Sequence, residues 1–195
     1  MKKIKFYFIM LLLILDISGC SQSSNNLETN NLQVNTISLK EYSDILQGKA
    51  EDWDSEAYLD NVDMYVYSNT NNGNDRYLDA FYFSKNKSKE SLWIKINRDG
   101  TITSTTINQQ ERISHNEQIV IDENLIDSID AFGKLSDDRI LRSIMNDRRA
   151  RLSLTYKTIN NQRRLVWILT KDFDSNLYYE SFYLDAYSEE ILLLD

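Results

Sequence analysis

The chain contains one cysteine, Cys20, and one histidine, His115. Nucleophilic catalysis needs a nucleophile, a general base and an orienting group that converge in space. His115 lies in a polar stretch with Ser114 as its neighbouring nucleophile, and Cys20 lies close to the start of the chain. One cysteine and one histidine also exclude disulfide frameworks and zinc sites built from these residues. We therefore predict that the protein is not an enzyme, that it holds no metal or cofactor, and that His115 is exposed.

Five arginines are concentrated in one part of a chain that is acidic elsewhere. Guanidinium groups suit carboxylate and phosphate partners, so these side chains could bind an acidic peptide, a teichoic-type polymer or a lipid headgroup. Alternatively, they pair with the chain's own Asp137, Asp138 and Asp147, or serve solubility alone. We expect them at one end of a hairpin and call them the arginine set: Arg148, Arg149, Arg151, Arg163 and Arg164.

Two acidic stretches resemble functional sites only in part. Residues 172–176 begin like an EF-hand calcium loop, but Leu177 replaces the required glycine and Tyr183 replaces the bidentate glutamate. An Asp-rich turn is the better interpretation.

A second acidic group alternates with apolar residues, which is typical of the solvent-exposed side of an amphipathic segment. We expect this group to be solvated, and it consists of Asp52, Asp54, Glu56, Asp60 and Asp63.

The composition limits the class of protein. The chain has 195 residues, of which 42% are hydrophobic and 27% are charged, so it has room for one ordinary domain or two small ones and is not disordered throughout. Acidic residues outnumber basic ones by 30 to 22, which gives a formal net charge of -8. Nucleic-acid binding favours a basic surface, so nucleic acid is not an expected partner.

The first twenty residues carry the pattern of an export signal. Lys2, Lys3 and Lys5 precede an unbroken apolar run over residues 6–15, which is too short to span a bilayer. The Ile-Ser-Gly-Cys sequence of residues 17–20 then resembles the lipobox of bacterial lipoproteins. This resemblance implies a signal peptide over residues 1–19 and a lipidated Cys20. The alternative is an ordinary secretory signal followed by a coincidental cysteine.

Residues 20–37 are rich in Ser, Asn and Gln and predict a flexible tether. A first α+β module is expected over residues 38–110. Ser38 and Glu41 form a capping box at the start of a helical stripe that reaches Tyr58, with an interruption near Gly48. Alternating runs then predict strands around residues 62–66, 77–83 and 92–96. Hairpin turns are expected at Asn72-Gly73 and at Asp99-Gly100, the second of which precedes an extended run over residues 101–106.

A second α+β module is expected over residues 117–195. A short helical stripe over residues 125–132 should end at Gly133, and Ser136 should cap another short helix that carries Ile140 and Leu141. Strands are expected at residues 151–157, 165–170, 177–187 and 191–194. Helix and meander therefore occur twice, and each half is small enough that the two should pack together.

The end of the chain resembles the closing hairpin of PepSY domains. An apolar strand over residues 165–169 is followed by a strand that carries Asp185-Ala186 and an exit at Glu190-Ile191, with Ser188-Glu189 where Thr-Gly would be expected. Residues 38–107 resemble a more diverged copy. The resemblance implies two tandem cystatin-like modules, each with helices on an antiparallel meander. It also implies a peptidase-inhibiting or regulatory role without catalytic residues. Asp185 itself should staple the turn through its carboxylate.

These features together predict a binding or regulatory module, anchored by lipid to the extracytoplasmic face of a bacterial cell membrane. Its expected partner is an envelope protein or peptide, bound at a sheet edge or concave face. The alternative is an accessory or sensor protein that binds an anionic envelope component through the arginine set. A hydrolase fits the residue inventory least. The oligomeric state, the partner's identity and the type of envelope stay open.

Overall fold

The computed structural model describes residues 34–35, 37–68, 76–108, 117–137, 140–141, 150–171 and 181–192. Several predicted features lie outside these residues: Cys20, most of the tether, the Asn72-Gly73 turn, His115, Arg148, Arg149 and the 172–176 turn. No helix among the described residues is long and apolar enough to cross a membrane. The elements, in chain order, are β1 (Val34–Asn35), α2 (Leu39–Trp53), β2 (Tyr58–Ser68), β3 (Arg76–Phe83), β4 (Glu90–Asn97), β5 (Ile102–Asn108), α3 (Ser128–Leu135), β6 (Ala150–Ile159), β7 (Gln162–Lys171), β8 (Ser181–Asp185) and β9 (Ile191–Leu192).

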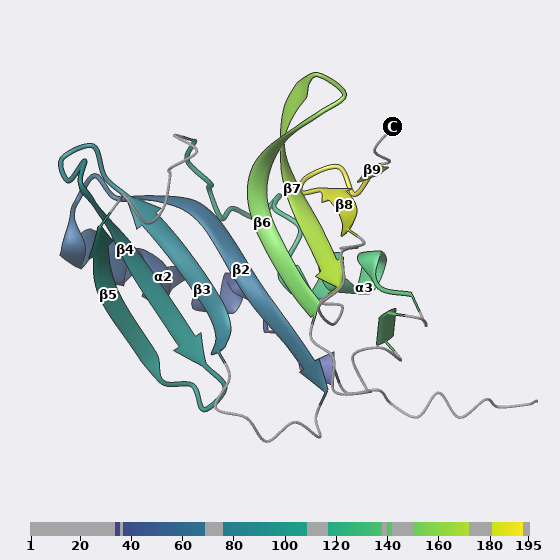
Figure 1. The fold of residues 1–195 in the computed structure, drawn as a ribbon, viewed down its shortest axis with the longest axis horizontal. Helices are drawn as coiled ribbons and strands as arrows, with labels where there is room; N and C mark the ends of the chain where they lie inside the picture. The colour runs from purple at the N-terminus through teal and green to yellow at the C-terminus, as the bar shows by residue number, and fades with distance from the viewer. Residues whose placement is uncertain are drawn as a thin grey trace, which may run out of the picture. The chain divides into compact units, whose positions relative to one another are not determined.

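The strands form one antiparallel sheet, so the α+β class is confirmed. Eight strands follow one another in the order β5-β4-β3-β2-β6-β7-β8-β9, and the short β1 pairs with the end of β2. Each half of the sheet is a four-stranded meander, and the halves join where β2 lies beside β6, with Val62 opposite Leu154 and Val66 opposite Ala150 (Figure 1). The meanders are therefore parts of a single continuous sheet.

One face of this sheet packs against the helices. Val62, Met64 and Val66 alternate along β2 toward this face, as Leu152 and Leu154 do along β6, and all five are buried. In Figure 1, α2 lies behind the β2–β5 half, and it contacts β4, while α3 contacts β7 and β8. A single hydrophobic cluster extends across both halves. The two halves therefore share one core.

The two helices meet at their amino-terminal ends. Ser38 caps α2 as predicted, because its Oγ accepts a hydrogen bond from the Glu41 amide at 3.2 Å. The buried Ser128 of α3 accepts from the Leu39 amide at 2.8 Å and donates to the Ile37 carbonyl at 2.6 Å. Asp127 accepts from a third amide of α2, that of Lys40, at 3.1 Å. Ser128 of α3 and the preceding N-cap residue Asp127 thus satisfy amide groups that the first turn of α2 leaves unpaired.

Two predicted helix boundaries were wrong. Helix α2 runs through Gly48 without interruption and ends at Trp53, so Tyr58 belongs to β2. Helix α3 begins at Ser128 and continues past Gly133 to Leu135. In both cases apolar residues beyond the glycine are buried, and their packing outweighs the modest helix penalty of one glycine. After α3, the Asp137 carboxylate accepts from the Ile140 amide at 2.7 Å and so caps the next helical turn. The amides that Ser136 would cap, those of residues 138 and 139, lie outside the described residues.

The sheet face opposite the helices also contains buried residues. Phe81 and Phe83 of β3 lie on it, and Phe81 stacks on Trp93 with ring centroids 5.5 Å apart. In the second half this face carries a separate apolar cluster of Ile159, Val166, Ile168, Tyr183 and Leu192.

Two members of the predicted solvated acidic group are not on a wet surface, so the prediction was wrong for them. Asp60 is fully buried, and Asp63 is half-buried and accepts a hydrogen bond from Ser153 at 2.6 Å. Both residues belong to β2, and Asp63 faces β6, which lies far from it in sequence. Asp52 and Glu56 are exposed, as expected. The partial burial of Asp63 follows from the pairing of β2 with β6, which the local pattern does not encode.

Candidate functional site

Strand β5 is the outer strand at one end of the sheet. It pairs along its whole length with β4, from Glu90 opposite Asn108 to Ile96 opposite Ile102, and no described strand pairs with its other edge. Residues 103–106, Thr-Ser-Thr-Thr, are exposed on both faces. Thr and Ile favour extended backbone, so the strand is stable in this form while its side chains stay polar. The sheet therefore ends in an accessible strand.

Within its own residues, β5 has none of the features that commonly protect an edge strand. Natural edge strands are commonly blocked by lysine, by proline, by a bulge or by being very short, because their unpaired backbone groups recruit other strands. Residues 102–108 contain no charged residue and no proline, and their register with β4 is regular. A strand with these properties is a template for another extended chain.

The direction of the backbone groups in β5 follows from the turn before it. Gly100 adopts a φ of 80°, and the Asn97 amide donates to the Thr101 carbonyl at 2.9 Å. Hydrogen-bonded and non-hydrogen-bonded pairs alternate along an antiparallel ladder. Counting from Thr101, the residues of β5 whose backbone groups bond to β4 are therefore Thr103 and Thr105. The N–H and C=O groups of Ile102, Ser104 and Thr106 then point away from β4. These residues form what we call the β5 edge. The predicted Asp99-Gly100 turn is confirmed, and it sets this register.

A shallow hollow lies at the far end of the same strand. It has a volume of about 230 Å³ and is lined by Thr106, Ile107 and Asn108 of β5 together with Lys89 and Glu90. One basic and one acidic residue stand beside an isoleucine, so the hollow can receive a side chain of a strand lying along β5. The β5 edge thus has backbone groups for hydrogen bonding and an adjacent recess.

The arginine set is not gathered at one end of the β6–β7 hairpin, so this part of the prediction was wrong. Arg151 lies opposite Thr170 at the open end, whereas Arg163 and Arg164 lie opposite Thr158 and Lys157 beside the turn. Six strand residues separate positions 151 and 157, a distance of about 20 Å. Arg163 and Arg164 are also neighbours on one strand and project to opposite faces.

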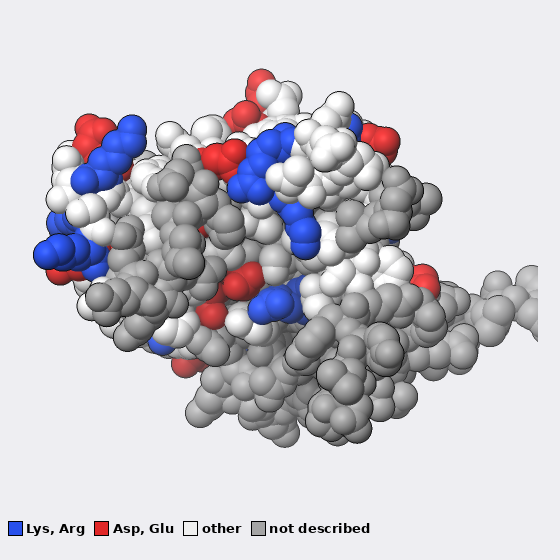
Figure 2. Space-filling model, turned by 45° about the horizontal axis from the view of Figure 1, so that its top comes forward, with Lys and Arg blue, Asp and Glu red and all other residues white. Residues whose placement is uncertain are grey.

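Both arginines near the turn already have acidic partners within the chain. Arg163 pairs with Glu117 at 2.7 Å and lies over the Tyr156 ring, 5.9 Å from its centroid. Arg164 contacts Asp185 at 3.3 Å and Glu190 at 3.0 Å. The sequence suggested self-pairing as an alternative, but with other acidic residues. In Figure 2, basic side chains stand in separate groups beside acidic ones on the face shown.

Asp185 staples the β8–β9 turn as predicted. Its Oδ1 accepts hydrogen bonds from the amides of Tyr187 at 3.1 Å and Ser188 at 3.0 Å. Burial alone would raise the pKa of Asp185, but these amides and the Arg164 guanidinium together outweigh it, so the pKa lies below its ordinary value. Within this turn Glu189 adopts a φ of 63°, a conformation that favours glycine.

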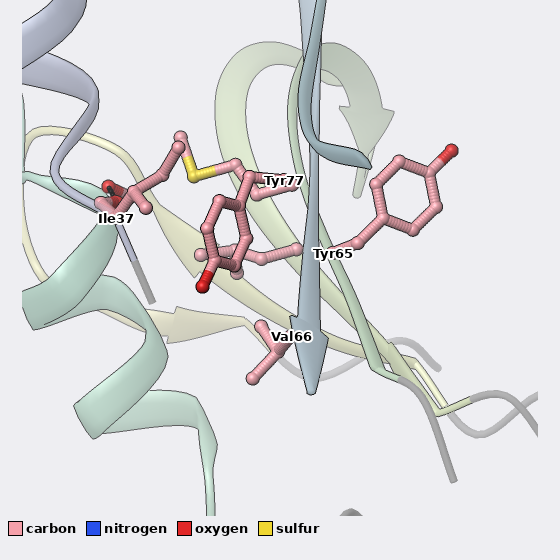
Figure 3. A pocket seen from close by; sticks show the side chains of 7 residues that line it. Ile37, Tyr65, Val66 and Tyr77 are labelled. Carbon is pink, nitrogen blue, oxygen red and sulfur yellow. Dashed lines mark hydrogen bonds between the residues drawn. The ribbon is translucent and has the colours of Figure 1, made fainter. Parts of the chain in front are cut away.

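A narrow gap lies between the segment before α2 and strands β2 and β3. Figure 3 shows Ile37, Val66 and Tyr77 pointing into it, while the ring of Tyr65 lies on the other side of β2. The gap is too narrow for a water molecule and has mostly apolar walls. It is an imperfection of packing where the two halves meet, not a ligand site.

Among the described residues, no group of three or more His, Cys, Asp or Glu side chains is placed to hold a metal ion. The β5 edge is the feature that sequence reasoning missed as a site. A strand after Asp99-Gly100 was expected, and its uncharged Ser/Thr composition was visible, but its outer position depends on the strand order. In comparisons with known proteins, the chain matches no protein-family model, no curated protein and no solved structure.

Proposed function

We propose that this protein is a lipid-anchored binding module of the bacterial cell envelope, which recognises an extended segment of a partner protein at the β5 edge. The observation that carries the proposal is a seven-residue outer strand without charge, proline or bulge, exposed on both faces over residues 103–106. In β-augmentation, backbone hydrogen bonds supply affinity and recesses for alternate side chains supply specificity. The β5 edge and its adjacent hollow offer both.

The available hydrogen bonds are enough for a weak or regulated complex. Three residues of the β5 edge present up to six backbone groups, and each intermolecular bond contributes about 0.5–1.5 kcal/mol net. Ordering a flexible partner segment opposes part of this gain. An interaction of this size suits a regulatory contact that forms and dissociates. Modulation of a peptidase, implied by the PepSY resemblance, would be such a contact.

Two structural details support the PepSY resemblance. The strand order is the one that two tandem modules would produce if their first strands paired. In the closing turn, Glu189 stands where the family pattern has glycine, and its φ of 63° is the conformation for which glycine is suited. A family with glycine at this position would thus share the backbone path seen here.

The proposed anchor rests on the sequence around Cys20. Lipidation would hold the protein at the membrane through acyl chains, and the polar segment that follows would act as a spacer. Replacing Cys20 by serine removes the thiol that forms the thioether, so we expect an unprocessed or released protein in cell fractionation. Full membrane retention of a processed Cys20→Ser protein would contradict the anchor.

Proline substitutions in β5 test the binding site. Ser104→Pro removes an N–H that points outward, so the fold should persist while an added strand loses a central hydrogen bond. Thr103→Pro removes an N–H directed toward β4 and should destabilise the sheet, which makes it the internal check on the assigned direction. Ser104→Ala keeps the backbone N–H and is the matched control.

The readout is photo-crosslinking in native membranes from a probe at Thr106, with denaturant midpoints measured on each variant. We expect one partner band with the wild type and with Ser104→Ala, and its loss with a stably folded Ser104→Pro. Retention of the same band by Ser104→Pro would contradict binding at the β5 edge.

The alternative function, binding of an anionic envelope component, has weaker support. Arg163 and Arg164 would have to exchange Glu117, Asp185 and Glu190 for the ligand, and Arg151 stands apart from them. A salt titration separates the two proposals, because phosphate-type binding weakens steeply with ionic strength and strand addition does not. Arg163→Ala combined with Arg164→Ala should leave partner capture at β5 intact.

A further inference from the structure

A second surface feature lies on the helix side of the sheet, between α2 and the segment 118–121. It is a groove of about 320 Å³, within the size range of small-molecule sites. The Ile119 amide donates to the Leu59 carbonyl at 2.8 Å and so holds the segment beside the start of β2. One wall is therefore helical, the other is extended chain, and Leu59 and Tyr82 form the floor.

The groove offers hydrogen-bond acceptors on Asp44, Gln47 and Tyr82, and its other polar side chains, Ser43 and Gln118, can also accept. Asp44 on α2 is exposed, and its carboxylate has no hydrogen bond or ion pair with the described residues. The side-chain nitrogen of Gln47 donates one hydrogen bond to Glu51 at 2.8 Å, and the side-chain oxygen of Gln47 remains to accept. No Lys or Arg lines the groove. The nearby Lys40 directs its ammonium group to the Glu123 carbonyl at 3.0 Å, so it does not neutralise Asp44.

Tyr82 is the polar group at the floor. Its side chain is 1% exposed, and its hydroxyl has no hydrogen bond with the described residues. Burial raises the pKa of Tyr82, so the phenol stays neutral over the physiological range. Because Tyr82 lines the groove, its hydroxyl can accept a hydrogen bond from a ligand that lies there. Leu59, Ile119 and Ile121 supply apolar surface next to it.

From these contacts we infer that the groove binds a primary alkylammonium group: its aliphatic stem lies on Leu59, Ile119 and Ile121, and its N–H groups donate to Asp44, Gln47 and Tyr82. An ammonium group has three donors and no acceptor, which matches the three acceptors on Asp44, Gln47 and Tyr82 and the absence of Lys and Arg from the lining. The net negative charge of the chain favours the approach of a cation. This site is independent of the β5 edge, since it lies on other elements and uses side chains rather than a strand edge.

The chemistry is shared by two sources, a lysine side chain of a polypeptide and a free diamine. The test therefore uses two probes, Nα-acetyl-lysine N-methylamide and cadaverine, with Nα-acetyl-norleucine N-methylamide as the neutral control of equal stem length. Each is titrated into the full-length protein in detergent micelles, and the δ1-methyl resonances of Ile119 and Ile121 are followed by NMR. Saturable shifts with the lysine amide alone point to a polypeptide source, and shifts with cadaverine alone point to a free amine. Saturable shifts with both mean that the ammonium group itself is recognised.

Variants decide whether the assigned residues bind the ammonium group. Asp44→Asn removes the charge but keeps the shape and should weaken binding about tenfold, the expected loss for a charge-assisted hydrogen bond. Tyr82→Phe should weaken it less. Asp130→Asn removes an equal charge from an exposed site on α3 and should leave binding unchanged. Equal binding of the norleucine amide, unchanged binding by Asp44→Asn, or no saturable shift with either amine would overturn the inference.

Discussion

Strands β5 and β9 occupy the two outer positions of the same sheet, yet they end it differently. β5 has seven residues, is paired with β4 throughout, and exposes residues 103–106 on both faces. β9 has two residues, and it pairs with β8 only at Tyr183 and Leu184. Both strands close a four-stranded meander that follows a helix. The same order of elements thus produces one long edge and one short edge.

The side chains beside the two edges differ as well. At the β8–β9 turn, Asp185 binds two amides, Arg164 bridges Asp185 and Glu190, and Lys134 of α3 pairs with Glu189 at 2.7 Å. At the β4–β5 turn, the Asp99 carboxylate accepts from the Thr101 amide at 2.8 Å, and the strand beyond carries only uncharged residues. A very short edge strand offers no template, whereas a regular seven-residue strand does. The contrast therefore leaves β5, and not β9, as the edge for the proposed strand addition.

The largest expected effect tests whether the two halves are one folding unit. Trp167 on β7 is fully buried, and its Nε1 donates to the Ile126 carbonyl at 2.9 Å. Trp167→Ala should lower the free energy of unfolding by about 3–5 kcal/mol. Ile94→Ala, at an equally buried position in the first half, should cost about 2–5 kcal/mol. Because both residues belong to one cluster, each variant should show a single cooperative transition by circular dichroism. Two separate transitions would mean that the two halves unfold as independent domains.

A smaller effect is expected where the helices of the two halves meet. Ser128→Ala leaves the Leu39 amide and the Ile37 carbonyl without their buried partner, so the free energy of unfolding should fall by about 1–3 kcal/mol in a denaturant titration. Ser43→Ala is the control. Its hydroxyl donates to the Lys40 carbonyl within the same helix, and its loss should change stability by about 0.5 kcal/mol or less. Equal effects would mean that α3 does not cap α2.

The same contrast shows which parts of the fold can be predicted from sequence. The Ser38 cap, the Asp99-Gly100 turn and the Asp185 turn are each formed by residues at most three positions apart, and all three were predicted. The capping of Leu39 by Ser128 spans 89 residues, and no local pattern indicates it. Likewise, the strand at residues 102–108 was predictable in outline, but its outer position follows from the pairing of β2 with β6. The candidate site is thus a consequence of strand order, which local sequence rules do not determine.

The arginine set also shows that closeness in sequence does not determine position in the fold. Closeness in sequence suggested closeness in space, but the β6–β7 hairpin directs Arg163 and Arg164 to opposite faces and places Arg151 at its other end. An Asn160-Asn161 turn, with φ values of 50° and 61°, makes this hairpin tight and fixes that register. Two asparagines at such a turn are a recognisable hairpin signal, so the separation could have been anticipated from the register they impose.

The closing turn of the second half offers a still smaller effect. Glu189 adopts a φ of 63°, which costs a residue with a Cβ about 1–2 kcal/mol relative to glycine. Glu189→Gly and Glu189→Ala both remove the exposed pair with Lys134, which contributes at most about 1 kcal/mol. The difference between the two variants therefore isolates the backbone, and Glu189→Gly should be more stable than Glu189→Ala by roughly 1 kcal/mol in thermal unfolding. Equal stabilities would show that the turn relaxes and does not hold the short edge in place.

The last predicted effect is a loss of stability at low pH, caused by protonation of the Asp185 carboxylate at the β8–β9 turn. Burial alone would raise the pKa of Asp185, but the amides of Ser188 and Tyr187 and the Arg164 guanidinium hold it below the ordinary value. A carboxylate with a lowered folded-state pKa contributes stability that is fully present above its unfolded pKa of about 3.9, and this stability is lost as the pH falls through the folded-state pKa. In Asp185→Asn the side-chain oxygen still accepts from the two amides, but nothing titrates. The wild type should therefore have a higher denaturant midpoint than Asp185→Asn, and the difference between the two midpoints should be constant from pH 5 to 8 and should shrink below about pH 4. Glu190→Gln removes a charge from the same turn but leaves Asp185 in place, so it should retain this acid sensitivity. A difference that does not change with pH would mean that the charge of Asp185 does not help to hold the short edge closed.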